Sequence, residues 1–91
     1  MTANKYSASI IEDTILSRVQ FLLSQRHNID PKQIKYDTLV THELGLYSLD
    51  LIELMMDLEK EYNIKIPDVP PQEPIQTVGN FIELIAKSMQ R

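Results

Sequence analysis

The chain has 91 residues, of which 9 are basic and 13 acidic, for a formal net charge of −4, and it contains no cysteine. A chain of this length forms one domain with one core layer, and the missing cysteines exclude disulfides and thiolate metal sites, which suits a reducing cytoplasm. The acidic balance argues against nucleic acid as a partner, and no apolar run approaches the roughly twenty residues that cross a membrane.

The first predicted element is a helix that begins near Ser9, because Ser9 and Glu12 have the spacing of a capping box. Apolar residues then recur at steps of three and four through Leu23 and form one stripe. Asn28 is a candidate left-handed residue at the end of this helix. We therefore expect a single domain over residues 1–91 in which residues 1–8 form a flexible N-terminus.

A long loop is predicted to follow, because no helical period is sustained between His27 and Tyr47. The dipeptide Asp30-Pro31 can start a single turn. Connections this long in small domains are usually functional. The apolar residues that can anchor the loop are Ile34, Leu39, Val40, Leu44 and Leu46.

The helical pattern returns from Ser48 to Tyr62, and Asn63-Ile64 indicates a helix stop with a left-handed residue. Four prolines then permit at most one short turn through residues 66–75. Thr77 can cap a last helix whose apolar stripe extends to Met89, although Gly79 weakens that helix by about 1 kcal/mol relative to alanine. The pattern predicts an all-α fold: a small four-helix bundle of three main helices and a short, proline-rich third helix or turn.

The second helix has an unusual charge pattern. Residues 37–74 hold nine acidic and two basic residues, a net charge of −7. On a helical wheel, an acidic stripe falls opposite the core face, with apolar residues at its border. Such a surface can dock a basic, partly apolar patch, or it can be an ordinary solvated face. The stripe consists of Asp50, Glu53, Asp57 and Glu61, and the border residues are Leu49, Ile52 and Met56.

The run from Leu44 to Leu54, LGLYSLDLIEL, resembles the acyl carrier protein family, and so does Ile64 to Asp68, IKIPD. The resemblance implies a carrier domain in which Ser48 is esterified by 4′-phosphopantetheine, derived from coenzyme A, whose thiol holds an acyl group as a thioester. It implies as partners a phosphopantetheinyl transferase and acyl-loading and acyl-processing enzymes with basic docking patches. The pathway it implies is fatty acid biosynthesis or a related one, such as polyketide or specialised lipid synthesis.

The resemblance also assigns surfaces to this chain, which we expect to be a monomer that inserts into no membrane. The residues that it implies for partner docking are Asp50, Glu53, Met56 and Asp57, and the apolar border of the stripe adds Leu49 and Ile52. The residues that it implies for the lining of an acyl pocket are Leu54, Leu58, Ile66 and Phe81.

Two features of the sequence bear on modification of Ser48. A serine at a helix start lies at the positive end of the helix dipole, where free amides stabilise a phosphate diester. The preceding residue is Tyr47, where fatty-acid carriers have aspartate, and a tyrosine can neither cap the helix nor offer a carboxylate to a basic transferase. The alternatives are therefore an aminoacyl or peptidyl carrier, or an unmodified protein of this fold that docks through its acidic helix.

Catalysis and metal binding are not expected. Ser48 and His42 lack a G-x-S-x-G turn and any fixed geometry, so they do not indicate a nucleophile and base. Two distant histidines do not make a metal site, and no D-x-D-x-D-G calcium loop is present. We therefore interpret the chain as a non-catalytic carrier with no metal ligands.

Overall fold

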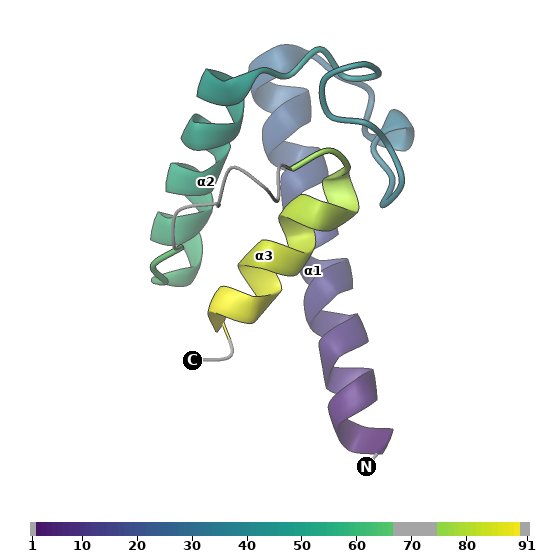
Figure 1. Ribbon diagram of the computed structural model, residues 1–91, viewed down its shortest axis with the longest axis vertical. Coiled ribbons are helices and arrows are strands. Elements are labelled where there is room, and N and C mark those ends of the chain that lie inside the picture. The colour runs from purple at the N-terminus through teal and green to yellow at the C-terminus, as the bar shows by residue number, and fades with distance from the viewer. Residues whose placement is uncertain (1, 67–74, 90–91) are drawn as a thin grey trace.

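The computed structural model describes residues 2–66 and 75–89, and the regular secondary structure of this part of the chain consists of helices and one isolated β-bridge. Figure 1 shows the arrangement of its elements, which are α1 (Thr2–His27), the 3₁₀ turn η1 (Pro31–Gln33), α2 (Ser48–Tyr62) and α3 (Val78–Met89). The predicted all-α bundle is confirmed. The proline-rich turn falls mostly on residues 67–74, outside the described residues.

Helix α1 begins at Thr2, seven residues before the predicted start at Ser9, so that prediction was wrong. Residues 2–8 contain neither glycine nor proline, and a serine can lie inside a helix without breaking it. At 1.5 Å per residue a helix of 26 residues is about 39 Å long. The longest dimension of the molecule is 38 Å, and α1 runs along it in Figure 1.

The predicted helix ends are confirmed. Asn28 and Asn63 both have left-handed backbone, with φ of 59° and 54°. The amide of Ile64 donates to the carbonyl of Glu59 at 3.1 Å, which closes the end of α2. At the start of α3, the Asn80 amide donates to Thr77 Oγ1 at 3.0 Å, and Asn80 Oδ1 accepts from the Thr77 amide at 3.0 Å.

One hydrophobic core joins the three helices and the long loop, and α1 packs against α3. Of the predicted loop anchors, Ile34, Val40 and Leu46 are buried and Leu44 is partly buried. Leu39 is 37% exposed, so its prediction as a core anchor was wrong. Leu39 anchors the loop through its backbone instead, which pairs with Thr77 in the isolated bridge.

This bridge fastens the loop to the start of α3. The amide of Val78 donates to the carbonyl of Thr38 at 2.9 Å, and the amide of Gly79 donates to the carbonyl of Tyr36 at 2.7 Å. A Cβ at residue 79 would lie 2.9 Å from Tyr36 O. Gly79 therefore permits a backbone contact that any side chain would obstruct.

Tyr36 also ties the loop to α1. Its hydroxyl donates to Asp13 Oδ1 at 2.6 Å. The pKa of Tyr36 is raised from 10.0 to about 12. The larger cause is partial burial of the phenol, and the second is its hydrogen bond to Asp13. The loop is thus held on both sides before it reaches α2.

Candidate functional site

Ser48 is the first residue of α2 and is exposed. The preceding residue, Tyr47, has extended backbone, with φ −113° and ψ −179°, and its carbonyl accepts the first helical hydrogen bond from the Leu51 amide at 3.0 Å. A residue in this position is the N-cap of the helix. The hydroxyl of Ser48 therefore lies at the accessible N-terminal end of α2.

The carboxylate of Asp50 organises this helix start, because its Oδ2 accepts from the Tyr47 amide at 3.0 Å. The amides of the first turn, including those of Ser48 and Leu49, have no acceptor within the helix. Together with the helix dipole they favour an anion at Ser48. A phosphate diester on the Ser48 hydroxyl fits this arrangement.

The loop residues just before Ser48 are fixed in place by burial and by backbone hydrogen bonds. The Leu46 side chain is 1% exposed, and its amide donates to Val40 O at 2.8 Å. The Thr41 hydroxyl donates to Leu46 O at 2.8 Å, and Gly45 provides a left-handed turn with φ 72°. The backbone is therefore anchored in the core two residues before the exposed serine.

An arginine of α1 reaches across to α2, a contact that the sequence analysis missed. Arg26 Nη2 lies 2.6 Å from Asp57 Oδ2, and Arg26 Nη1 lies 3.7 Å from Glu53 Oε1. Asp57 Oδ2 has almost no solvent exposure, so this oxygen is covered in the folded chain. Two predicted docking carboxylates are therefore engaged within the protein itself.

A second arginine repeats the pattern two turns earlier on α1. Arg18 Nη2 lies 3.1 Å from Glu61 Oε1, and the guanidinium stands over the ring of Phe21 at 4.9 Å from its centroid. The spacing of Arg18 and Arg26 places both on one side of α1. This spacing was visible in the sequence, but which helix the arginines would meet was not.

The solvent-facing side of α2 carries apolar side chains as well as charged ones. Leu49, Ile52 and Met56 are exposed by 66%, 50% and 51%, and Tyr47 before them is 66% exposed. The wheel reading placed the acidic stripe opposite the core and these residues only at its border, and that placement was wrong. The acids form the flank that Arg18 and Arg26 of α1 meet. At 100° per residue, Leu49 and Met56 lie opposite the core face of α2, and the centre of the acidic stripe lies about a quarter-turn to one side.

The residues expected to line an acyl pocket all lie in the hydrophobic core. The exposed fraction is 3% for Leu54, 0% for Leu58, 8% for Ile66 and 1% for Phe81. The backbone of Ile66 is held to α2, since its amide donates to Glu59 Oε2 at 2.8 Å. Helices α2 and α3 and the segment after α2 therefore all contribute side chains to the core.

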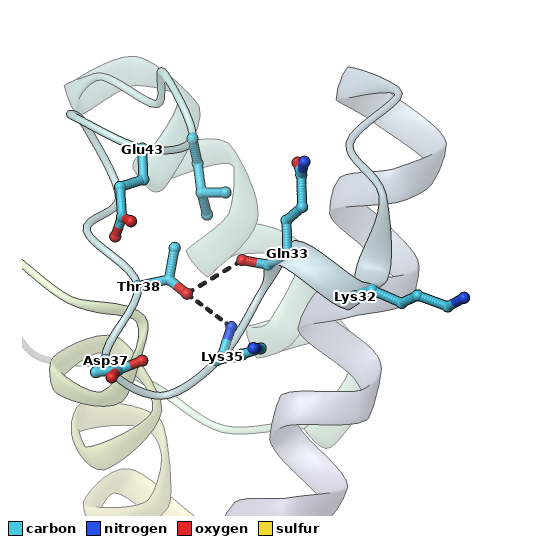
Figure 2. A pocket seen from close by; sticks show the side chains of 7 residues that line it. Lys32, Gln33, Lys35, Asp37, Thr38 and Glu43 are labelled. Carbon is cyan, nitrogen blue, oxygen red and sulfur yellow. Dashed lines mark hydrogen bonds between the residues drawn. The ribbon is translucent and has the colours of Figure 1, made fainter.

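A cavity of about 650 Å³ lies elsewhere, at the loop between η1 and α2. Figure 2 shows its charged lining, with Lys32 and Lys35 on one side and Asp37 and Glu43 on the other. Thr38 braces its wall, accepting from the Lys35 amide at 2.9 Å and donating to Gln33 O at 3.1 Å. None of the expected acyl-pocket residues lines this polar cavity.

Within residues 2–66 and 75–89, no three His, Cys, Asp or Glu side chains gather as a metal site. In the same ranges, no helix has the length and apolar character needed to span a membrane.

Comparisons with known proteins converge on one family. A family model described as "Phosphopantetheine attachment site" matches residues 17–85. The acyl carrier protein of Thermotoga maritima is 34% identical over 77 residues, which cover 85% of this chain and 94% of that protein. The acyl carrier protein of Porphyromonas gingivalis is 39% identical over 69 residues, or 76% and 87% of the two chains. The mitochondrial acyl carrier protein of Saccharomyces cerevisiae is 37% identical over 87 residues, or 91% and 69%.

Proposed function

The chain belongs to the acyl carrier protein family, whose prosthetic group is covalent 4′-phosphopantetheine, and from this we propose that Ser48 is the residue that carries the group. The terminal thiol of that arm holds acyl groups as thioesters. The observation that supports Ser48 is its place as the exposed first residue of α2, at the positive end of the helix dipole. The amides of the first turn would stabilise the phosphate at that point.

In the proposed function, the protein carries the acyl group on its arm and presents it to enzymes, and it catalyses no reaction itself. The core-anchored turn at Leu46 holds Ser48 outward, where a phosphopantetheinyl transferase and later acyl-loading and acyl-processing enzymes can reach it. The proposed docking surface is the start of α2, and the proposed retreat for an acyl chain lies among the core residues Leu54, Leu58, Ile66 and Phe81. The proposed setting is fatty acid synthesis or a related pathway, with an aminoacyl or peptidyl cargo as the alternative.

Intact-mass measurement tests this proposal. The purified protein is incubated with coenzyme A and a broad-specificity phosphopantetheinyl transferase, and we expect a gain of one phosphopantetheine. Ser48→Ala should abolish the gain, whereas Ser17→Ala, which changes another exposed serine, should leave it intact. An adduct that persists in Ser48→Ala would refute the assignment.

A second candidate function is favoured by Tyr47, which stands where fatty-acid carriers have aspartate. In this alternative the protein is never modified and acts only by docking through α2. It predicts partner binding that is unaffected by Ser48→Ala, together with no adduct on the wild-type protein. Charge reversal at Glu53 and Asp57 tests docking in both cases.

A further inference from the structure

We propose, on the basis of the function proposed above, that the polar cavity between η1 and α2 is a second cargo site, which binds acyl groups that end in a carboxylate. The arm on Ser48 lies back along the loop, and the carboxylate at the end of its acyl group binds the ammonium groups of Lys32 and Lys35. The structural basis is a cavity of about 650 Å³ whose charged lining shares no residue with the hydrophobic core proposed for an alkyl chain.

The size and lining of the cavity suit a small polar group. Its volume lies within the roughly 300–1,000 Å³ that is typical of ligand pockets. Among the described residues that line it, Leu44 alone is apolar. An alkyl chain gains little by leaving water for such a wall, because the hydrophobic effect scales with the apolar area that is buried. The lining therefore favours polar cargo over alkyl cargo.

The cavity lies within reach of an arm attached to Ser48. Leu44 lines the cavity four residues before Ser48, so the two Cα atoms are at most about 14 Å apart. Gly45 turns the chain between them, with φ 72°, which keeps the separation below this limit. From phosphorus to sulfur the arm is a run of about fourteen atoms, which spans about 16 Å at the roughly 1.2 Å per atom of an extended backbone. An acyl group on the sulfur adds to this reach.

The cavity holds charges of both signs that do not pair with one another. Figure 2 shows Lys32 and Lys35 on one side and Asp37 and Glu43 on the other. The ion pairs in the described part of the chain involve none of these four side chains. Glu43 is partly engaged, since its Oε1 accepts from the Leu39 amide at 2.7 Å. Two unpaired ammonium groups at one wall favour an anionic group there.

The loop fixes the backbone of both lysines. The Lys32 amide donates to Asp30 Oδ1 at 2.9 Å, and the Lys35 amide donates to Thr38 Oγ1 at 2.9 Å. Thr38 itself is 6% exposed. Binding therefore has to order only the two side chains, which limits its entropic cost.

The opposite wall suits the arm itself. The arm carries two amide N–H groups and a hydroxyl, and the carboxylate of Glu43 can accept hydrogen bonds from them. Glu43 lies closer to Ser48 along the chain than either lysine does. The order of groups along the loop thus matches a loaded arm, with an acceptor for its amides first and cations for its terminal carboxylate beyond. Weak contacts suffice, because a short tether gives an effective concentration of about 1 mM or more.

Nuclear magnetic resonance of the loaded protein tests this proposal. A broad-specificity phosphopantetheinyl transferase loads Ser48 from coenzyme A, glutaryl-coenzyme A or pentanoyl-coenzyme A. The two acyl groups have the same number of carbons and differ in ending in a carboxylate or a methyl group. Relative to the unacylated arm, the glutaryl group should shift the amide signals of Thr38 and Glu43. The pentanoyl group should instead shift those of the core residues Leu54 and Phe81.

Matched variants identify the groups that bind the carboxylate. The lysines hold the pKa of a ¹³C-labelled glutaryl carboxylate down, so the double change Lys32→Gln and Lys35→Gln should raise that pKa by about 0.5 or more at low salt. At about 1 M salt, where the Debye length is about 3 Å, most of the difference should disappear. Lys87→Gln removes an exposed lysine of α3 and should change neither the pKa nor the amide signals. Circular dichroism checks that every variant is folded.

The inference is overturned if the glutaryl group leaves the cavity signals unchanged, or if the double lysine variant leaves the pKa of its carboxylate unchanged. Either result would leave the adduct on Ser48 in place, and the proposed function with it. If instead no adduct forms on the wild-type protein, the proposed function fails, and the second cargo site fails with it.

Discussion

Gly79→Ala offers a test of the contact between the long loop and α3, because two effects of the change have opposite signs. In a helix, alanine is favoured over glycine by about 1 kcal/mol. In this structure, however, the new methyl group would lie 2.9 Å from Tyr36 O, an atom of the backbone. An ordinary contact between carbon and oxygen is about 3.3 Å or longer, so the loop must move away.

The magnitude follows from what that movement disturbs. The hydrogen bond from the Gly79 amide to Tyr36 O, 2.7 Å long, contributes about 0.5–1.5 kcal/mol, and overpacking costs about 1–3 kcal/mol. After the gain of about 1 kcal/mol in helix propensity is subtracted, we expect the free energy of unfolding to fall by about 0.5–3.5 kcal/mol. For a domain of this size, the midpoint temperature falls by about 4–8 °C for each kcal/mol.

Urea unfolding followed by circular dichroism measures this change, with two alanine controls. Glu83→Ala, at an exposed site on α3, should shift the free energy of unfolding by no more than about 0.5 kcal/mol. Gly45→Ala has no atom within 4 Å of the new methyl group, so its effect should reflect only the left-handed backbone. A Gly79→Ala protein more stable than wild type would refute the steric reasoning.

Two further predictions concern tyrosines near the site. The Tyr47→Asp protein should be about 1 kcal/mol more stable than the Tyr47→Ala protein, because a carboxylate at this N-cap can accept hydrogen bonds from the free amides of α2. Equal unfolding midpoints for the two variants would contradict this. The pKa of Tyr36 is raised to about 12, so the phenol binds its proton more tightly in the folded chain. Its contribution to stability is complete below pH 10 and is lost as the pH rises from 10 towards 12. The difference in denaturation midpoint between wild type and Tyr36→Phe should shrink over that range, and a constant difference would count against the bond to Asp13.

Local signals in the sequence predicted the elements well where a few neighbouring residues decide the outcome. The left-handed caps at Asn28 and Asn63 and the hydroxyl cap of Thr77 depend on contacts within one turn, and the structure has all three. The start of α1 was misplaced, because a capping box at Ser9 permits a helix start without preventing the helix from extending further back.

The resemblance of residues 44–54 to the acyl carrier protein family predicted Ser48 as the attachment site, and the local helix pattern predicted its place at a helix start, where the structure has it exposed. The pairing of the α2 carboxylates with arginines could not be obtained in this way. A wheel shows which residues of α2 share a side, but α1 decides which of those sides is covered. Arg26 and Arg18 lie more than twenty residues from the carboxylates that they meet, so only the tertiary fold could pair them.

The sequence by itself predicted an acidic helical domain with Ser48 at the head of an amphipathic helix, because helix periodicity, capping and composition are local properties, and the resemblance of residues 44–54 to the acyl carrier protein family indicated a carrier. The tertiary structure decided which side chains of that helix remain free. By bringing two arginines of α1 beside the acids, it leaves leucine, isoleucine and methionine as the face next to the serine. Three acidic side chains of α2 are thus paired at short range with two arginines, because the tertiary fold brings the middle and end of α1 beside α2.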